Sequence, residues 1–158
     1  MKRIFDIVVA TILLILSLIP LFLVAFGVRV TSKGSVLYWS DRVGAGNVIF
    51  KMPKFRTMQL ETPTVATHLM RDSDVYLSSI GGFLRRTSLD ELPQLWSILR
   101  GDMSFVGPRP ALYNQDDLIK LRANEGVDRL VTGMTGWAQI NGRDELPIPE
   151  KVALDVEY

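Results

Sequence analysis

Hydrophobic and polar positions divide the chain into two unlike parts. Residues 7–28 contain no charged side chain over 22 positions, and 18 of these positions are apolar. A helix of that length reaches about 33 Å, which is enough to cross a hydrocarbon core of roughly 30 Å. All of the charge lies outside this stretch. The pattern predicts a membrane-associated segment, residues 1–28, followed by a charged part, residues 29–158.

The apolar stretch carries two features that argue against a straight span. Pro20 lies near its middle, where a proline removes one backbone hydrogen bond, frees the carbonyl of Leu16 and bends the helix. Basic residues lie on both sides of the stretch: Lys2, Arg3, Arg29 and Lys33. Because lysine and arginine favour the cytoplasmic side of a membrane, these flanks give no orientation for a span. A plain span and a bent helix that enters and leaves by the same face both remain open, whereas the stretch is long for a secretory signal peptide.

Beyond residue 29 the pattern changes to that of short strands. Apolar runs at residues 36–39 and 48–50 flank a loop with glycine and asparagine, which predicts a β-hairpin. Lys54 and Arg56 follow the second run, and strand alternation would place both on one side. Pro53 restricts a continued strand to the edge of a sheet. A basic cluster of this kind is usually a solvated face, unless other phosphate ligands converge on it.

Helical spacing of apolar residues predicts three further elements. The first is a helix that begins near Ser88 and buries one face: Leu89, Leu92, Leu95, Trp96 and Leu99. A second helix is predicted over residues 112–121, ended by Gly126, and a third over residues 152–158. The third lacks a stop signal, so we expect the natural helix to continue beyond Tyr158. With the hairpin, these elements predict a mostly helical α+β fold with a small sheet.

The composition excludes several kinds of site. The absence of cysteine rules out a disulfide scaffold, a thiol nucleophile and a zinc site built on cysteine. The single histidine, His68, rules out a multi-histidine metal centre, and we assign it no role because a lone histidine is commonly a surface residue. The 18 basic and 17 acidic residues leave a net charge of +1, which gives no general attraction for nucleic acid. Any anion binding must therefore be local.

The densest chemistry lies between residues 85 and 110. Asp90 and Glu91 fall in the first turn of the predicted helix, where the helix dipole favours ionised carboxylates. Acidic residues at this position are commonly no more than caps. Arginines nearby argue for a further role, because guanidinium groups bind phosphate oxygens through paired hydrogen bonds: Arg85, Arg86, Arg100 and Arg109. Carboxylates among arginines also suit Mg²⁺ and a diphosphate, since Mg²⁺ takes one or two carboxylates plus substrate phosphates.

Several motifs together resemble those of the monotopic phosphoglycosyl transferases, also called bacterial sugar transferases. The segments that carry the resemblance are KFRTM at residues 54–58, LRRTSLDELPQLWSIL at residues 84–99, GDMSFVGPRP at residues 101–110 and TGWAQINGR at residues 135–143. The resemblance runs from the N-terminal helix to Tyr158 and indicates the small single-domain form of the family. Members of this family start membrane-bound glycan assembly by moving a sugar phosphate from a nucleotide sugar to a polyprenyl phosphate.

The resemblance implies an activity, partners and a location. The expected donor is a nucleoside diphosphate sugar, with uridine as the nucleoside, and the expected acceptor is undecaprenyl phosphate. The product would serve exopolysaccharide, lipopolysaccharide or other glycoconjugate synthesis, with downstream glycosyltransferases and membrane lipids as further partners and no nucleic acid. The resemblance also favours the bent form of residues 1–28, a re-entrant membrane helix. It leaves a catalytic domain, residues 29–158, on the cytoplasmic face of the bacterial inner membrane.

The resemblance further implies roles for individual residues. It makes Asp90 the nucleophile that forms a covalent aspartyl phosphosugar intermediate and a ligand of Mg²⁺, and it makes Glu91 the catalytic partner of Asp90. Basic positions expected to bind substrate phosphates are Lys54, Arg56, Arg85, Arg109 and Arg143. Asp155 falls on an acidic position near the site. Pro20 is expected to bend the membrane helix, with Ser17 close to the bend.

This chain departs from the family pattern in three places. Ile19 rather than serine precedes Pro20, and Ser17 lies three residues before it, so we expect different hydrogen bonding at the bend. Thr132 replaces a common proline before the glycine-rich loop. The partly membrane-associated C-terminal segment of the family does not follow Tyr158, which predicts a shortened form. A membrane-anchored module that binds a nucleotide sugar without catalysis is the alternative function, because the arginine and tryptophan residues would serve it equally well.

Overall fold

The computed structural model describes residues 1–60, 62, 73–142 and 146–158, and the structural statements below refer to these residues. His68 and Arg143 lie outside them. Helices predominate over two small sheets, which confirms the predicted α+β class. The α-helices are α1 (Lys2–Leu16), α2 (Leu18–Thr31), α3 (Gly81–Arg86), α4 (Leu95–Arg100), α5 (Asp116–Asn124), α6 (Trp137–Ile140) and α7 (Ile148–Glu157). The 3₁₀ helices are η1 (Ala45–Asn47), η3 (Ser73–Tyr76), η4 (Leu89–Gln94) and η5 (Val127–Arg129), and the strands are β1 (Leu37–Val43), β2 (Ile49–Phe55), β3 (Ser104–Val106), β4 (Ala111–Leu112) and β5 (Gly133–Thr135).

The N-terminal apolar stretch forms two helices joined at a bend. α1 and α2 meet at Ser17 and are inclined to each other by 62°. Pro20 lies in the first turn of α2, where its missing N–H removes no bond within that helix. The Ser17 hydroxyl donates to the Leu14 carbonyl over 3.2 Å. The predicted bend is therefore confirmed, and the break falls three residues before the proline.

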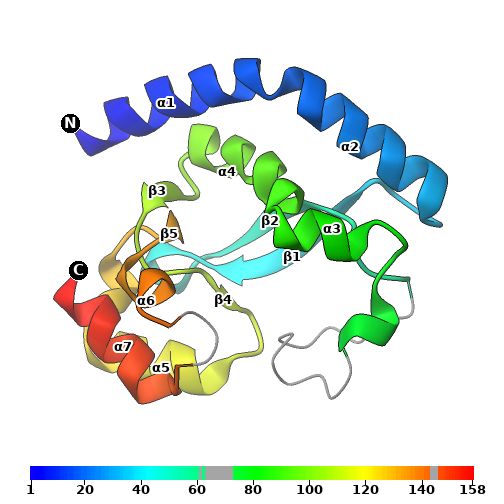
Figure 1. Cartoon of the computed structure of the whole chain (residues 1–158). Coiled ribbons are helices and arrows are strands. Elements are labelled where there is room, and N and C mark those ends of the chain that lie inside the picture. The colour runs from blue at the N-terminus through cyan, green and yellow to red at the C-terminus, as the bar shows by residue number, and fades with distance from the viewer. Residues whose placement is uncertain (61, 63–72, 143–145) are drawn as a thin grey trace.

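The two sides of the bent pair have different surroundings. On the inner side α1 packs against α4 and α2 contacts β2, with Val24 and Val28 buried (Figure 1). The outer side is apolar and exposed, and the exposed fraction is greatest around the bend, at 72% for Leu16, 74% for Ile19 and 71% for Phe22. Among the described helices, none is long and apolar enough by itself to cross a membrane. Taken together, α1 and α2 meet that requirement by length and composition.

Polar contacts fix α1 to the rest of the protein. The Arg3 guanidinium donates to the carbonyls of Ile98 and Leu99 in the last turn of α4, where a cation also interacts favourably with the helix dipole. The buried carboxylate of Asp6 accepts a hydrogen bond from the Phe105 backbone N–H over 3.3 Å. Because these bonds join residues about one hundred positions apart, the helix pair belongs to the folded unit.

The predicted hairpin is present and extends further than its apolar runs. β1 and β2 are antiparallel, with Leu37 opposite Phe55 and Val43 opposite Ile49. β4 pairs with the other side of β1, so the sheet order is β2-β1-β4 and β2 lies at an edge. Pro53 is therefore at an edge strand, as its missing N–H predicts. The continued strand brings Lys54 to the face of the hairpin that borders the functional site described below.

The glycine-rich segments pack backbone against backbone. β3 and β5 pair in parallel, and the residues after β3 continue beside β5, where the Gly107 N–H donates to the Thr135 carbonyl over 2.8 Å and the Gly133 N–H donates to the Pro108 carbonyl over 2.9 Å. A Cβ atom on Gly107 would lie 2.3 Å from the Val131 carbonyl oxygen, and one on Gly133 would lie 2.2 Å from the Gly107 nitrogen. No side chain fits at such distances. These glycines thus hold the loop that carries Arg109 against β5.

The segment before α4 differs from the single helix that the sequence predicts. Residues 89–94 form η4, and the α-helix begins only at Leu95. Ser88 has a left-handed backbone with a φ of 56° and makes no side-chain capping bond, so the capping-box spacing does not cap this turn. Because the 3₁₀ turn has about 3.0 residues per turn rather than 3.6, the buried face shifts, and Trp96 is 52% exposed instead of buried. Leu112 likewise lies in β4, before α5.

Candidate active site

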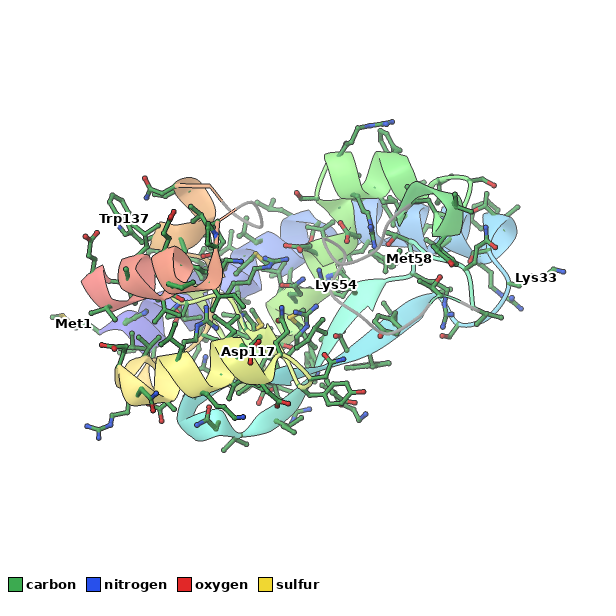
Figure 2. The ribbon with its side chains drawn as sticks, turned by 90° about the horizontal axis from the view of Figure 1, so that it is seen from below. Met1, Lys33, Lys54, Met58, Asp117 and Trp137 are labelled. Atoms are coloured by element: carbon green, nitrogen blue, oxygen red, sulfur yellow. The ribbon has the colours of Figure 1, made fainter. Side chains whose placement is uncertain are left out.

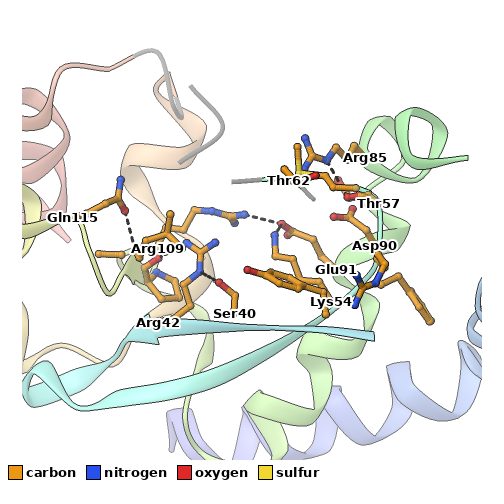
Figure 3. Close-up of a pocket in the computed structure, with 18 of the residues that line it drawn as sticks. Ser40, Arg42, Lys54, Thr57, Thr62, Arg85, Asp90, Glu91, Arg109 and Gln115 are labelled. Atoms are coloured by element: carbon orange, nitrogen blue, oxygen red, sulfur yellow. Dashed lines mark hydrogen bonds and ion pairs between the residues drawn. The ribbon is translucent and has the colours of Figure 1, made fainter. Parts of the chain in front are cut away.

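A cavity of about 490 Å³ is bordered by the hairpin, η4 and helices α5–α7. Figure 3 shows Arg85, Thr57 and Asp90 at one end and Gln115 at the other, with Arg109 reaching toward Glu91 between them. The volume is in the usual range for small-molecule sites. Among the lining residues, basic side chains (Arg42, Lys54, Arg56, Arg85, Arg109, Arg122 and Lys151) outnumber acidic ones (Asp90 and Glu91). This lining suits an anionic ligand.

Glu91 is fixed by two cations. Its Oε1 atom accepts hydrogen bonds from Lys54 Nζ over 2.9 Å and from Arg109 Nη2 over 2.6 Å. Burial alone would raise the pKa of Glu91, but Lys54 and Arg109 outweigh burial and lower that pKa to about 2. Burial lowers the pKa of Lys54, and Glu91 opposes this change. Glu91 is therefore a permanent anion at neutral pH with a fixed orientation.

Asp90 lies next to Glu91 in the chain but has a different environment. Its side chain lines the cavity and the residue is only 7% exposed. No other side chain within the described ranges donates a hydrogen bond to its carboxylate. Burial raises the pKa of Asp90. The positive charges of Lys54 and Arg85 oppose this rise, and the negative charge of Glu91 adds to it. The helix-dipole argument predicted stabilised anions at both positions; at Asp90 burial outweighs the stabilising effects, so that prediction is wrong for this residue.

Adjacent positions on a helical turn explain how neighbouring carboxylates reach such different places. In a 3₁₀ helix successive side chains leave the axis about 120° apart. Glu91 therefore points to Lys54 and Arg109, while Asp90 points to the end of the cavity that holds Arg85 (Figure 3). Packing of β2 against η4 brings Lys54 and Glu91 together although they are 37 residues apart.

Two further predicted phosphate-binding residues, Arg85 and Arg56, are each held by a neighbouring residue. Arg85 Nε donates to the Thr57 hydroxyl over 3.1 Å. The positive charge of Arg85 also opposes the rise that burial causes in the pKa of Asp90. Arg56 is held by Ser35, with its Nε donating to the carbonyl and its Nη2 to the hydroxyl, both over 2.8 Å. Both arginines line the cavity. The structure thus brings to one cavity the described basic residues that the resemblance assigns to phosphate binding: Lys54, Arg56, Arg85 and Arg109.

Asp155 lies behind the cavity rather than in it. It belongs to α7, is 1% exposed, and accepts two hydrogen bonds on Oδ2 from Arg122, over 3.0 Å and 2.6 Å. Burial raises the pKa of Asp155, and Arg122 opposes that rise. Arg122 lines the cavity and donates to the Arg109 carbonyl over 2.8 Å. Asp155 therefore contacts the site through Arg122 and not directly.

The sequence prediction missed two arginines that line the cavity, Arg42 and Arg122. Arg42 donates to the Ser40 hydroxyl and lies beyond the apolar run that marked the first strand, so extended strand alternation could have found it. Arg122 lies four residues after Leu118 on the buried face of α5, and a buried arginine requires an acidic partner. Gln139 also lines the cavity and belongs to the TGWAQINGR segment that carries the family resemblance.

Of the two carboxylates that line the cavity, Asp90 fits a metal ion better than Glu91 does. Within the described part of the chain, no three histidine, cysteine, aspartate or glutamate side chains are grouped to hold an ion. Mg²⁺ commonly takes only one or two protein carboxylates and completes its shell with substrate phosphates and water. Glu91 is engaged by two cations, whereas Asp90 offers a carboxylate with no such partner. The donor set therefore fits Mg²⁺ held jointly by Asp90 and a diphosphate.

An apolar bent helix pair and a cation-lined cavity with adjacent carboxylates together define a class of protein suited to phosphate-bearing substrates. Comparison with protein families gives the class its name. The model of the family described as "Bacterial sugar transferase" matches residues 1–158, and the chain belongs to this family.

Curated relatives cover the whole of this chain. It is 41% identical over 169 residues to the undecaprenyl-phosphate glucose phosphotransferase of Komagataeibacter xylinus, covering 99% of this chain and 32% of the relative. It is 40% identical over 163 residues to the UDP-glucose:undecaprenyl-phosphate glucose-1-phosphate transferase of Escherichia coli K12, covering 100% and 35%. With the exopolysaccharide production protein ExoY of Sinorhizobium fredii it shares 37% identity over 173 residues, covering 99% and 76%. The chain thus spans about a third of the first two relatives and three quarters of the third.

Proposed function

We propose that this protein is a phosphoglycosyl transferase that moves a sugar 1-phosphate from a UDP-sugar to undecaprenyl phosphate and releases UMP. The proposal is supported by membership of the family and by relatives at 40–41% identity whose names specify undecaprenyl phosphate and glucose transfer. Glucose is therefore the first sugar to test. The relationship to ExoY supports a role in exopolysaccharide synthesis.

The unequal environments of Asp90 and Glu91 carry the mechanistic part of the proposal. Glu91 is engaged by Lys54 and Arg109 and is poorly available to attack a substrate. Asp90 is buried at the cavity, and no side chain in the described ranges hydrogen-bonds to it. A carboxylate with few stabilising partners is the better nucleophile of the two. Asp90 is therefore assigned the covalent step.

The transfer consists of two displacements. An Asp90 carboxylate oxygen bonds to the sugar-bearing phosphorus, the bond from that phosphorus to the bridging oxygen breaks, and its electron pair leaves with UMP. An oxygen of undecaprenyl phosphate then bonds to the same phosphorus. The bond to Asp90 breaks, and its electron pair restores the Asp90 carboxylate. Division into two steps is the usual benefit of nucleophilic catalysis.

The basic residues bind and orient the phosphates. Lys54 and Arg109 are held in place by Glu91, and Arg85 lies beside Thr57 at the Asp90 end, so cations surround the position that we propose for the diphosphate. Fixed cations of this kind offset the charge of phosphoryl oxygens. Mg²⁺ bound to Asp90 and the diphosphate would supply further charge neutralisation. Removal of Mg²⁺ by EDTA is expected to reduce UMP release, and restoration by Mg²⁺ but not by K⁺ tests this assignment.

The bent helix pair is proposed to enter the membrane from the cytoplasmic face and to return to it. The exposed apolar side chains at the bend, Leu16, Ile19 and Phe22, would then lie among the lipid chains. Both outer ends of the pair carry basic residues, which favours the cytoplasmic side for each. The bonds from Arg3 to α4 keep this helix pair beside the domain that carries the cavity. A lipid phosphate at the membrane surface could then reach Asp90.

The topology can be tested by labelling single cysteines, because the chain has none of its own. Met1 and Lys33 flank the helix pair at its two ends (Figure 2). A cysteine at either position is expected to resist a membrane-impermeant reagent in intact cells and to react after the inner membrane is opened. Labelling of either position from the periplasm would contradict re-entry.

Release of UMP tests the activity. Purified protein in detergent with UDP-glucose and undecaprenyl phosphate is expected to release UMP through many turnovers, and release is expected to need the lipid beyond one equivalent. Binding of the nucleotide sugar without sustained release would contradict the transferase and favour a binding module.

A further inference from the structure

The loop that joins β3 to β4, residues 107–110, is fixed by hydrogen bonds from three different elements. Pro108 and Pro110 have no backbone N–H and a restricted φ, so bonds to the carbonyls of this loop come from elsewhere in the protein. The Pro108 carbonyl accepts the Gly133 N–H of β5 over 2.9 Å. The next two carbonyls, those of Arg109 and Pro110, each accept an arginine side chain. Bonds at three successive carbonyls fix the direction in which the Arg109 side chain leaves the loop.

Arg122 of α5 holds the first of these two carbonyls. Its Nη1 atom donates to the Arg109 carbonyl over 2.8 Å, while its Nε and Nη2 atoms donate to the Asp155 carboxylate. Three of the five N–H groups of this guanidinium are therefore used within the protein. The Arg122 side chain is only 8% exposed, and Asp155 offsets its charge. Although Arg122 lines the cavity, these contacts suit it to hold the loop rather than to bind a phosphate.

Arg42 holds the second carbonyl from the central strand of the sheet. It lies in β1, opposite Leu112 of β4, so it is next to the point where the loop enters the sheet. Its Nη1 atom donates to the Pro110 carbonyl over 3.2 Å, and its Nε atom donates to the Ser40 hydroxyl over 3.0 Å (Figure 3). One planar guanidinium thus joins its own strand to the loop, which a lysine with its single point charge could not do in the same geometry.

We propose that Arg42 and Arg122 are positioning residues, which direct the Arg109 guanidinium to the donor diphosphate by fixing the main chain of residues 109 and 110. This inference rests on the proposed function, in which Arg109 binds a phosphate. The tip of the Arg109 side chain donates to Glu91 over 2.6 Å, so Arg109 is fixed at both ends. In this arrangement neither positioning residue contacts the substrate.

The competing role for each arginine is direct contact with a phosphate, and a double-mutant cycle separates the two roles. A residue that acts only through Arg109 has nothing left to position once Arg109 is replaced, so its own replacement then has little further effect. A residue with its own phosphate contact lowers affinity by the same factor in both backgrounds, and so does a residue needed only for general stability.

The cycle measures binding of UDP in the presence of Mg²⁺. Arg109→Met is expected to weaken UDP on the order of tenfold to a hundredfold, because a hydrogen bond to a charged phosphate is lost. Arg122 is replaced together with its partner, as Arg122→Met, Asp155→Leu, so that no buried charge is left unpaired. This variant and Arg42→Met are each expected to weaken UDP about fivefold in the wild-type background and less than about twofold in the Arg109→Met background. Arg129→Met, at an exposed arginine that does not line the cavity, is the matched control and should change UDP affinity less than about twofold in either background.

Titration calorimetry on the full chain in detergent provides the affinities, urea denaturation checks that each variant is folded, and UMP release from UDP-glucose is measured in parallel. The two positioning variants are independent, so one of them suffices if the other fails to fold. An equal loss of UDP affinity in both backgrounds, for either arginine, would overturn the inference. So would unchanged UDP affinity in Arg109→Met or in both positioning variants. Coupled losses in a protein that releases no UMP would contradict only the transferase proposal, whereas uncoupled losses in an active protein would contradict only this inference.

Discussion

Two buried acidic regions lie at the cavity, and their carboxylates differ in whether a basic side chain is bonded to them. Between α5 and α7, Asp155 is paired with Arg122 through two hydrogen bonds and lies behind the cavity wall. At η4, Glu91 is paired in the same manner, but its neighbour Asp90 faces the cavity and receives no hydrogen bond from another described side chain. We infer that the paired charges build and orient the cavity wall, and we propose that the Asp90 carboxylate, which has no side-chain donor among the described residues, carries the chemistry.

The largest expected effect comes from removing the unpaired carboxylate. Asp90→Asn is expected to reduce sustained UMP release on the order of a thousandfold or more, because the nucleophile is lost. It is not expected to weaken folding at neutral pH, because burial already disfavours the ionised Asp90. Turnover assays and urea denaturation on the same preparation check both statements. An Asp90→Asn variant that keeps most of its turnover would contradict the proposed catalytic role of Asp90.

The next largest effect is expected where a pair is broken in the wall. Arg122→Met leaves the Asp155 carboxylate buried without its partner, and such a loss costs about 3–5 kcal/mol of folding free energy. The double variant Arg122→Met, Asp155→Leu is expected to recover most of that cost, because no charge is stranded. Arg100→Met, which breaks a pair between an exposed arginine and the partly exposed Asp102, is the matched control and is expected to cost under about 1 kcal/mol. Equal costs for the buried and the exposed arginine would contradict the structural role of the Asp155 pair.

A smaller effect on rate is expected for Glu91→Gln. Lys54 and Arg109 would lose the carboxylate that holds both of them, and misplacement of such groups typically lowers the rate about a hundredfold. The nucleophile remains, so turnover should exceed that of Asp90→Asn by at least tenfold under the same conditions. Steady-state kinetics with UDP-glucose measure the two variants side by side. Equal losses of turnover in Glu91→Gln and Asp90→Asn would show that Asp90 and Glu91 act as one unit.

The smallest expected effects are those of pH on stability, and they have opposite signs for the two carboxylates. The pKa of Glu91 falls from 4.5 to about 2 in the folded protein, so Glu91 stabilises the fold above pH 4.5 and loses this contribution as the pH falls toward 2. Burial raises the pKa of Asp90 above 3.8, so its ionised form weakens the fold at neutral pH, and this cost disappears on acidification. Without Mg²⁺, Glu91→Gln should be less stable than the wild type at pH 7 and Asp90→Asn more stable. Denaturation between pH 3 and 7 checks whether both differences shrink as the pH falls.

Local patterns in the sequence predicted much of this arrangement. The hairpin, its edge proline and the position of Lys54 follow from strand alternation, because each depends on neighbouring residues. The bend was predicted from Pro20, which lies three residues after the break at Ser17. The Asp90–Glu91 pair was located by its motif, and the resemblance to the bacterial sugar transferases agrees with the family match over residues 1–158.

The features that were missed depend on backbone geometry or on distant contacts. The positive φ of Ser88 and the 3₁₀ turn after it changed the helical period and exposed Trp96, and no residue type in that segment requires either. The Arg122–Asp155 pair joins residues 33 positions apart, so helical spacing on α5 could show a buried arginine but not its partner. The close backbone contact at Gly107 likewise depends on a loop some 25 residues away.

The central claim is that Asp90, and not Glu91, forms the bond to the phosphosugar. Intact mass spectrometry after incubation with UDP-glucose, without undecaprenyl phosphate, tests it directly. We predict a mass increase of one glucose phosphate on the wild type and on Glu91→Gln, mapped by peptide analysis to Asp90, and no increase on Asp90→Asn. An adduct that persists in Asp90→Asn, or one that maps to Glu91, would contradict the account.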